Sequence, residues 1–564
     1  MVFNERIRGI GAMTGDKRTF QLPGIGRIKS VDAALVLLLI ALAAAYSVYG
    51  LRQYDVVSAD GAGYASSGKA FFKTGDPRCF GTLFPPLYPF LVGLFNLALD
   101  NLETSARMVS VFFNALTLIP LYGLALDLWG RRAALCASIL FITLPFLHGM
   151  SGIDITEPTY TFFALAAAWA FRRCLAARGK GTAFAAGALL GIAYLARPEG
   201  FIVAAAFAGI LLLLLFLPPR KGWMGQALLL AVFWCGFLVP AAPYMNYLHN
   251  VTGAWQLSGK TGLNSSIIRE YRGETPPDQH MRLNEQGQEV GGGNSTLLDL
   301  MKESPDIFWG NIRDNLHALP RELAGTFPWF LFVLSCIGYL WLPRYEPEDG
   351  GERAAPARQG LMDRLLLASV CSPLALYVVY FVQPRGFYAY VPVFLMATGG
   401  GLARIDSWVR RITPLETGIV LPIVAVLGLW YVYSGIPAPK PPYHYTQDGA
   451  RYDDKQVGLR LRSIIPPGAT IITRSGRIGF YSQRAYLMPP QGSLAEIIAF
   501  ADKNHADYLI ATIQLLSMRP QLEILYQPLF GTGGNAPPLP GIEAVYIGQE
   551  PGGLPYIVYR FVRQ

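Results

Sequence analysis

Four short polar segments stand at the edges of long apolar runs, and they contain the residues best suited to chemistry. In the first segment, Asp55 and Asp60 precede Tyr64. A carboxylate held where water meets an apolar region can act as a general base, because it can accept a proton from a hydroxyl nucleophile. The alternative is that Asp60 only caps the short helix expected at 65–73.

Two further segments bring charges together over short spacings. Asp154 and Glu157 are three residues apart, so in a helical turn they would share a face, and Pro158 suits a helix start. Arg197 and Glu199 lie in a tight turn between two apolar runs. These charges can bind a polar substrate, or they form only a helix cap and a structural ion pair.

The fourth segment places Arg385 three residues before Tyr388, again between two apolar runs. A guanidinium can bind a phosphate through two hydrogen bonds. Arg and Tyr also anchor proteins at membrane surfaces, which is the alternative. The histidines show no HExxH or clustered spacing and the six cysteines are widely spaced, so neither a zinc site nor a disulfide framework is predicted.

The composition of the 564-residue chain is that of a membrane protein. Hydrophobic residues make up 52% of the chain and charged residues 15%, and the mean hydropathy is +0.32. Soluble proteins carry about 25% charged residues, so an ordinary soluble enzyme is excluded. The cations behind the net charge of +9 lie between the apolar runs, so the expected partners include membrane lipids and no nucleic acid.

The apolar runs predict a polytopic α-helical membrane protein with about eleven transmembrane helices of roughly 20 residues each. The first run has no cleavage pattern after it, so we expect a retained helix rather than a signal peptide. The runs lie near residues 31–50, 104–128, 132–150, 157–172, 181–196, 199–217, 224–243, 326–343, 363–382, 387–404 and 415–435.

The distribution of Lys and Arg predicts the orientation, because short cytoplasmic connections collect positive charge. We expect a cytoplasmic segment at 1–30 and a transmembrane domain at 31–435, with extracytoplasmic loops at 51–103 and 244–325. Residues 436–564 change to shorter, alternating runs typical of strands, with a helical pattern between them. They predict a small extracytoplasmic α/β domain.

The polar segments also carry a recognisable order of motifs. Residues 30–435 resemble the GT-C superfamily of membrane glycosyltransferases, and most of all glycosyltransferase family 39 in its broad sense. That family includes protein O-mannosyltransferases, lipid A aminoarabinose transferases and related bacterial enzymes. The motifs are Asp60-x-x-x-Tyr64, Gly75-Asp76, Pro85-Pro86-Leu87-Tyr88, Thr156-Glu157-Pro158, Ala196-Arg197-Pro198-Glu199-Gly200 and Ser258-Gly259-Lys260.

This resemblance implies a multi-pass enzyme of the bacterial inner (plasma) membrane, with a cytoplasmic N-terminus and a periplasmic C-terminal domain. Such an enzyme moves a hexose or pentose from a polyprenyl-phosphate donor to a lipid, glycan or protein acceptor, with inversion and without a nucleotide. The other classes open to this composition are a transporter or flippase and a non-catalytic scaffold of envelope glycan assembly. A transporter needs charged or broken helices at the bilayer midplane.

The resemblance also implies roles for single residues. The family's catalytic aspartate corresponds to Asp60, which would deprotonate or orient the acceptor, with Asp55 as a weaker alternative. Glu157, or less directly Asp154, would bind sugar hydroxyls. For the donor phosphate we expect Arg385 and Lys69, with Arg197 and Lys260 in reserve, and for other substrate contacts Tyr64, Tyr88, Glu199 and Tyr388.

One departure from the family bears on metals and on the acceptor. Lipid A aminoarabinose transferases carry Glu-Lys before the double proline, where this chain has Leu83-Phe84. An expected metal or phosphate contact is therefore missing. We predict no required cofactor and no metal ligands, while a divalent cation stays an option, and lipid A is disfavoured as the acceptor.

Overall fold

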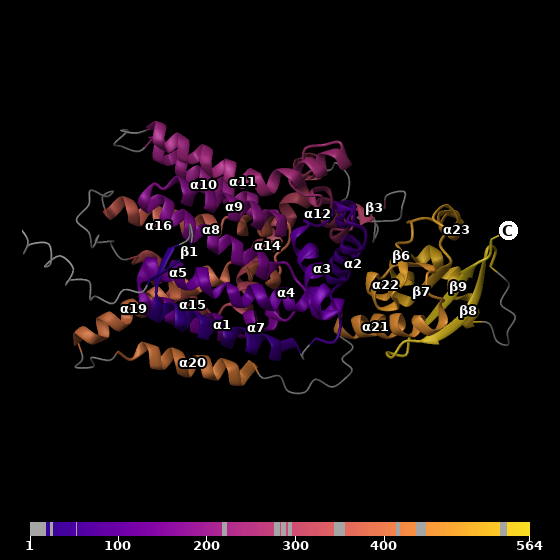
Figure 1. Cartoon of the computed structure of the whole chain (residues 1–564). Coiled ribbons are helices and arrows are strands. Elements are labelled where there is room, and N and C mark those ends of the chain that lie inside the picture. The colour runs from indigo at the N-terminus through magenta and orange to yellow at the C-terminus, as the bar shows by residue number, and fades with distance from the viewer. Residues whose placement is uncertain are drawn as a thin grey trace, which may run out of the picture.

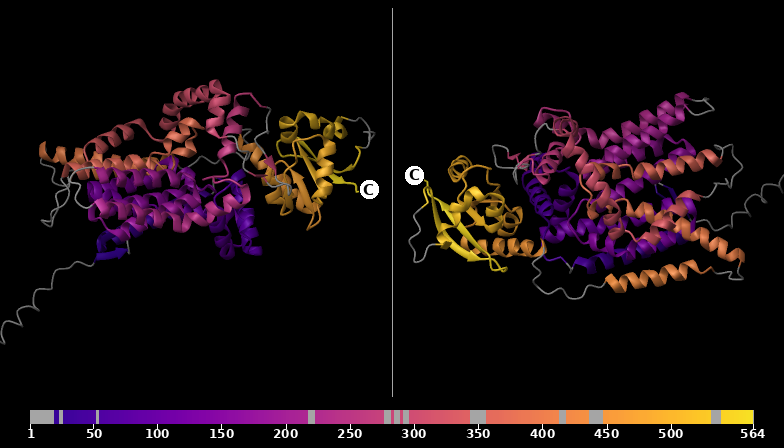
Figure 2. Two further views of the ribbon diagram at one scale, coloured as in Figure 1. Left: turned by 90° about the horizontal axis from the view of Figure 1, so that it is seen from above. Right: turned by 180° about the vertical axis from the view of Figure 1, so that it is seen from behind.

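The computed structural model shows a long helical bundle with an α/β unit beyond one end, in every view (Figures 1 and 2). A small hairpin of β1 (Thr19–Leu22) and β2 (Gly26–Lys29) precedes the first helix of the bundle. The structure describes residues 19–22, 26–51, 54–216, 223–275, 282–283, 289–290, 296–342, 356–412, 418–435, 447–530 and 539–563.

The first half of the bundle consists of apolar helices, and apart from the long loop that follows the first of them, their connections are short. Two of the predicted runs are helix pairs, α4 with α5 and α6 with α7, and the second pair is bent by 59°. The helices are α1 (Ser30–Gly50), α4 (Leu102–Leu116), α5 (Leu118–Trp129), α6 (Arg131–Thr143), α7 (Pro145–Ser151), α8 (Glu157–Ala177), α9 (Lys180–Ala196), α10 (Glu199–Phe216) and α11 (Trp223–Thr252).

The second half follows the outer loop and is more broken. Here α14 and α15 meet at 97°, so α14 lies across the end of α15. The helices are α14 (Pro305–Thr326), α15 (Trp329–Leu340), α16 (Pro356–Val370), α17 (Leu374–Val379), α18 (Pro384–Phe387), α19 (Val391–Ile412) and α20 (Val420–Gly435).

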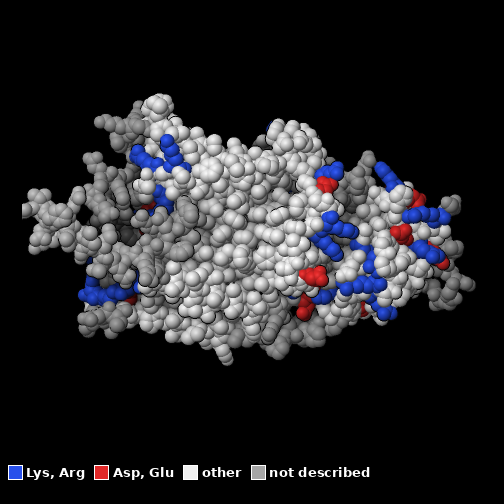
Figure 3. All heavy atoms as spheres, in the orientation of Figure 1, with Lys and Arg blue, Asp and Glu red and all other residues white. Residues whose placement is uncertain are grey.

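Each of the eleven predicted apolar runs overlaps one of these helices or helix pairs. Among the described residues, five helices are long and apolar enough to cross a membrane, or up to seven if each bent pair is one span. A multi-pass membrane protein follows, and the number of eleven spans stays a prediction. On the face drawn in Figure 3, charged side chains gather toward the two ends and leave an uncharged band between them, as lipid contact requires.

Glycines allow the bundle helices to approach closely. A Cβ atom at Gly187 of α9 would lie 2.0 Å from the carbonyl oxygen of Phe233 on α11, and one at Gly236 would lie 2.2 Å from that of Phe184. Small residues at such crossings let membrane helices pack backbone to backbone. This contact fixes α9, whose end carries Arg197, against the long helix α11.

The loop expected on the outer side after α1 folds into α2 (Ala59–Thr74), the short 3-10 helix η2 (Pro77–Phe80) and α3 (Leu87–Leu99). The helix expected at 65–73 therefore begins earlier, at Ala59, with Ser58 as its cap. The second long loop holds α12 (Thr261–Tyr271), β3 (Arg282–Leu283), β4 (Glu289–Val290) and α13 (Leu297–Glu303).

The C-terminal residues form a five-stranded sheet in the order β6-β5-β7-β9-β8. Strand β5 (Thr470–Thr473) runs parallel to β6 (Ala485–Leu487) and β7 (Tyr508–Thr512), while β9 (Pro555–Phe561) runs antiparallel to β7 and β8 (Ile542–Gln549). The helices are α21 (Gln447–Ile464), α22 (Gly476–Ser482), α23 (Leu494–Lys503), α24 (Ile513–Met518), the 3-10 helix η3 (Pro520–Tyr526) and α25 (Gln527–Phe530).

The alternation at 469–473, 507–512, 543–548 and 556–562 predicts four strands, and these are β5, β7, β8 and β9. The Ser cap and helical spacing at 493–505 predict a helix, which is α23. Helix α1 begins at Ser30, and residues 436–446 lie outside the described part of the chain; the segment boundaries at 30 and 436 stay predictions.

Candidate active site

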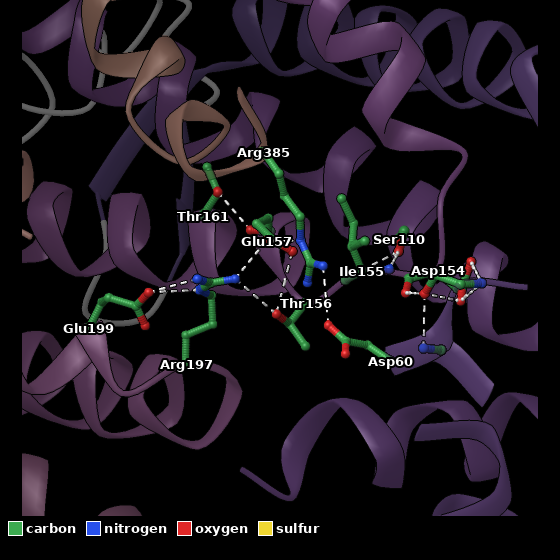
Figure 4. A network of polar contacts seen from close by, with 12 residues as sticks. Asp60, Ser110, Asp154, Ile155, Thr156, Glu157, Thr161, Arg197, Glu199 and Arg385 are labelled. Atoms are coloured by element: carbon green, nitrogen blue, oxygen red, sulfur yellow. Dashed lines mark hydrogen bonds and ion pairs between the residues drawn. The ribbon is translucent and has the colours of Figure 1, made fainter. Parts of the chain in front are cut away.

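A network of charged side chains joins four segments that are far apart in the sequence (Figure 4). It is built from the first turn of α2, the start of α8, the turn between α9 and α10, and the short helix α18. The polar groups that the sequence places at the edges of separate apolar runs thus meet at one end of the bundle, the end nearest the α/β unit (Figure 1). The members are Asp60, Glu157, Arg197, Glu199 and Arg385.

Glu157 is the centre of the network. Its side chain is only 3% exposed, and its Oε1 accepts hydrogen bonds from Nε of Arg385 and, at 2.6 Å, from Nη1 of Arg197. A buried carboxylate requires such partners, because an unpaired buried charge is strongly unfavourable. Glu157 therefore holds two guanidinium groups in fixed positions.

Arg197 extends the network to α10 and α17. Its Nη2 donates to Oε1 of Glu199 at 2.7 Å and to the hydroxyl of Tyr377 at 3.3 Å. The Tyr377 hydroxyl in turn donates to the same oxygen of Glu199 at 3.3 Å. The ion pair expected between Arg197 and Glu199 is thus present, while the motifs of the sequence did not point to its partner Tyr377. Tyr377 could have been noticed as a tyrosine near the outer end of the apolar run at 363–382, where its hydroxyl can reach a polar site.

Asp60 is the most accessible carboxylate of the network, with 35% of its side chain exposed. Its Oδ2 accepts a hydrogen bond from Nη1 of Arg385 at 3.2 Å. Asp60 is not the cap of α2, because the hydroxyl of Ser58 accepts from the Gly61 backbone N–H and fills that role. Burial acts to raise the pKa of Asp60, but the positive charges of Lys260 and Arg385 lower it overall, so the carboxylate stays ionised.

The three carboxylates share a position relative to their helices. Asp60, Glu157 and Glu199 all lie in the first turns of α2, α8 and α10. Free backbone N–H groups and the helix dipole favour negative charge there. The bundle therefore directs three helix N-termini and three carboxylates toward one region.

Lys260 adds a cation beside Asp60. The loop reaches the site because Gly259 lies against Thr82, where a Cβ atom would come within 2.0 Å of the Thr82 carbonyl oxygen. The ammonium lies 4.2 Å from the ring centre of Phe84. Burial lowers the pKa of Lys260, although Asp60 opposes this shift. In the described part of the chain, Lys260 forms no salt bridge within 4.0 Å.

Asp154 faces Ser58 and not the network (Figure 4), and its expected role in sugar binding stays a prediction. Its Oδ2 accepts hydrogen bonds from the backbone N–H and the hydroxyl of Ser58, at 2.9 and 2.8 Å. Gly61 makes room for it, because a Cβ atom there would lie 1.3 Å from that oxygen. Burial raises the pKa of Asp154 to about 6. The residue ties the start of α2 to the bundle.

The expected tyrosines are buried and engaged with helix α4 or with other aromatic rings. The hydroxyl of Tyr88 donates to the carbonyl of Ala106 at 2.8 Å, and that of Tyr388 donates to Oδ1 of Asn114 at 2.6 Å. Tyr64 packs edge-on against Phe84 and Tyr88. The hydroxyls of Tyr88 and Tyr388 thus have partners on α4, and the substrate contacts expected of these residues stay predictions.

Asp55 and Lys69 lie apart from the network, and both are exposed. Lys69 is nine residues beyond Asp60, which places it on the opposite side of α2. The carbonyl of Asp55, not its carboxylate, has the recorded contact, to Nζ of Lys455. Lys260 is therefore better placed than Lys69 to meet an anion beside Asp60.

Within the described residues, no group of three or more His, Cys, Asp or Glu side chains could hold a metal ion. Oε1 of Glu157 already accepts from two guanidinium groups, and Asp60 from one. The need for a metal stays open to measurement.

Part of the chain matches a known protein family. Residues 84–246 match the family model of dolichyl-phosphate-mannose-protein mannosyltransferase. This segment contains Glu157, Asp154 and Arg197 but neither Asp60 nor Arg385. A search of curated protein sequences returned no match.

Two crystal structures of ArnT from Cupriavidus metallidurans share the fold. The structure bound to undecaprenyl phosphate superposes with a TM-score of 0.55 at 14% identity, and the apo structure with 0.56 at 13%. Each comparison covers 94% of this chain and 99% of ArnT. The chain therefore has the fold of the GT-C membrane glycosyltransferases, as the motif order at 30–435 predicts, and its residues 84–246 match a mannosyltransferase family within that group.

Proposed function

We propose that the protein is a membrane glycosyltransferase that moves a sugar from a polyprenyl-phosphate donor to a hydroxyl or amine acceptor at the extracytoplasmic face. One observation carries the proposal: Asp60 is an ionised, partly exposed carboxylate placed beside the cations Arg385 and Lys260. A base beside two cationic side chains suits the transfer of a group away from a phosphate. The shared fold with ArnT, which has been crystallised with undecaprenyl phosphate, supports this donor class.

In the proposed reaction, the acceptor oxygen or nitrogen forms a bond to the anomeric carbon while the bond from that carbon to the phosphate oxygen breaks. Asp60 accepts the proton of the acceptor. The electron pair of the broken bond stays with the polyprenyl phosphate, whose negative charge is stabilised by Lys260 and Arg385. Attack from the side opposite the phosphate inverts the anomeric carbon.

Arg385 can serve the phosphate without leaving its partners. Its Nε is bound to Glu157 and its Nη1 to Asp60. In the part of the chain that the structure describes, Nη2 donates no hydrogen bond, so it can point to a phosphate oxygen. In this arrangement Glu157 is a positioning residue that fixes Arg385 and Arg197, rather than the ligand for sugar hydroxyls suggested by the sequence.

The location of the network speaks against transport. A transporter requires charged groups or broken helices near the bilayer midplane. Here the carboxylates lie in the first turns of their helices, at one end of the bundle. We propose that this end faces the periplasm of a bacterial inner membrane, because the opposite end is rich in arginine: α6 begins with Arg131 and Arg132, and Arg173 lies in the last turns of α8, which begins at Glu157.

The proposal is tested with the purified full-length protein in detergent. A panel of radiolabelled polyprenyl-phosphate sugars is supplied together with envelope extract as the source of acceptor, and donor consumption is measured. We expect consumption of at least one donor by the wild type and by Asp55→Asn, and loss of consumption in Asp60→Asn. Asp55 is the matched control because it is an exposed aspartate of the same loop outside the network.

Three other results would change the proposed mechanism or the proposed function. Equal consumption by wild type and Asp60→Asn would remove Asp60 from the mechanism. Failure of the wild type to consume any donor, with acceptor extract present, would contradict the transferase function itself. Loss of consumption in the presence of a chelator would add a metal ion to the reaction.

A further inference from the structure

The α/β unit contacts the segment that leads into α2. Helix α22 lies at the edge of this unit nearest the bundle (Figure 1). The hydroxyl of its Tyr481 accepts a hydrogen bond from the backbone N–H of Val57 at 2.8 Å, and both residues are buried. Val57 is followed directly by Ser58, the cap of α2, and Asp60 lies in the next turn.

A buried backbone N–H needs a hydrogen-bond partner, and here the partner comes from a residue more than four hundred positions away. The path of the chain just before a helix cap determines the direction of the first turn of the helix. The position of Val57 therefore bears directly on where the carboxylate of Asp60 points.

Lys455 of α21 makes the second contact with the same segment. Its Nζ donates to the carbonyl of Asp55, forms an ion pair with Glu103 of α4 at 3.4 Å, and lies 5.0 Å from the ring centre of Tyr481. One ammonium group thus links the α/β unit, the segment before α2 and a helix of the bundle. Lys455 also holds the Tyr481 ring in place beside Val57.

Apolar packing completes the contact. Tyr481 forms a small buried cluster with Val57 and Ala62, and Phe480 packs both against this cluster and against the cluster that contains Tyr64. On the bundle side of this segment, the carboxylate of Asp154 accepts hydrogen bonds from the backbone N–H and the hydroxyl of Ser58. The start of α2 is therefore held between the bundle and the α/β unit.

We propose that the C-terminal α/β unit positions the catalytic carboxylate: Tyr481 and Lys455 hold residues 55–57 so that Asp60 stays against Arg385. This inference rests on the proposed function for its kinetic consequence, but the contact itself can be measured separately. It gives the unit a role in the turnover step, in addition to any contact it makes with an acceptor.

The test compares Tyr481→Phe with Tyr546→Phe in the full-length protein. Tyr546 is the matched control, because its hydroxyl contacts Arg460 within the α/β unit and not the segment before α2. Two quantities are measured: the steady-state kinetics of donor consumption, and hydrogen–deuterium exchange of the peptide that contains Val57.

For Tyr481→Phe we expect kcat to fall about 10-fold with the donor KM nearly unchanged, since misplacing a reacting group slows the chemical step more than binding. Exchange at Val57 should become faster in this variant and remain unchanged in Tyr546→Phe. Lys455→Met should lower kcat in the same way, and Lys455→Arg should restore part of it.

The proposal is overturned if Tyr481→Phe keeps the wild-type kcat, if only its donor KM changes, or if Tyr546→Phe loses the same activity. Exchange at Val57 that is equal in wild type and Tyr481→Phe would also overturn it. If the wild type proves inactive on every donor, the proposed function fails, while the exchange measurement still decides whether Tyr481 holds this segment.

Discussion

At the end of the bundle away from the α/β unit, Asp406 is only 5% exposed and is bound by Arg132 at 2.7 Å and by Arg410. At the other end, Asp60 is 35% exposed and, among the described residues, accepts one side-chain hydrogen bond, at 3.2 Å, from an arginine that is shared with Glu157. Both ends combine arginine with carboxylate. They differ in how many of the carboxylate's hydrogen-bonding positions are already used.

The carboxylate of Asp127, at the same end of the bundle as Asp406, also has its hydrogen-bonding positions occupied by protein donors. It accepts two hydrogen bonds from Arg173, at 2.7 and 2.9 Å, and one from the indole N–H of Trp169 at 2.9 Å. Such carboxylates connect helices and have little capacity left for a ligand. A membrane helix bundle can therefore use arginine and carboxylate side chains to connect its helices at one end. At the other end it can leave hydrogen-bonding positions of the same residue types available for a substrate.

The largest expected effect is that of Asp60→Asn. We expect kcat/KM for the donor to fall at least about 10³-fold, because the amide cannot accept a proton from the acceptor. Since the pKa of Asp60 is lowered from its ordinary value, this base stays ionised at mildly acidic pH. The wild-type rate should therefore not fall between about pH 7 and pH 5 on account of Asp60. A pH–rate profile of both proteins checks the two statements together, and a rate that follows a group titrating near neutrality would assign the base elsewhere.

Arg385→Lys should have the next largest effect, a loss of about 10²-fold in kcat. Lysine keeps the charge but cannot bind Glu157, Asp60 and a phosphate at once through a planar fork. The matched variant is Arg132→Lys, which removes a guanidinium at the opposite end and should leave kcat within about 2-fold of wild type. Steady-state kinetics of the two variants decide the point. Similar losses in both would erase the proposed difference between the ends.

Lys260→Met should raise the donor KM about 10-fold with a smaller effect on kcat, as expected for the loss of a phosphate contact. The control is Lys69→Met. Lys69 is an exposed lysine of α2 that lies away from the network, so this variant should behave as wild type. Because the pKa of Lys260 is lowered, this lysine loses its charge at a lower pH than an ordinary lysine.

The lowered pKa of Lys260 sets the direction in which donor affinity changes with pH. Donor affinity of the wild type should weaken as pH rises through the lowered pKa of Lys260, whereas in Lys260→Arg the affinity should stay constant over the same range. A donor KM that does not change with alkaline pH in the wild type would remove Lys260 from the phosphate site.

The sequence predicted which segments would meet but not which atoms. The distribution of Lys and Arg predicts the extracytoplasmic side not only for the loop at 51–103 but also for the turns before Glu157, at Arg197 and at Arg385. The bundle brings the charged residues of these segments together, namely Asp60, Glu157, Arg197, Glu199 and Arg385. Such an assignment needs only helix length and charge, which are local properties.

Side-chain direction and long-range contacts depend on tertiary packing, and there the sequence was insufficient. Asp154 and Glu157 would share a face in a helical turn, but α8 begins only at Glu157, so Asp154 is free to turn toward Ser58. The approach of Lys260 depends on the close packing of Gly259 with Thr82, and the hydrogen bond of Tyr481 to Val57 depends on the docking of the α/β unit. No spacing along the chain encodes these contacts.

The smallest effect on activity is expected from Asp406→Asn, which tests the other side of the comparison. The amide removes the negative charge that both Arg132 and Arg410 contact, so two guanidinium groups at a helix junction lose their common partner. We expect the free energy of unfolding to fall by about 2 kcal/mol, since each hydrogen bond to a charged group contributes about 1.5–3 kcal/mol and both arginines are partly exposed to water. Thermal unfolding in detergent measures this loss, and donor consumption below the unfolding temperature should stay within about 2-fold of wild type. If Asp406→Asn instead keeps its stability and loses turnover, the end away from the α/β unit takes part in the reaction, and the division between an assembling end and a reacting end does not hold.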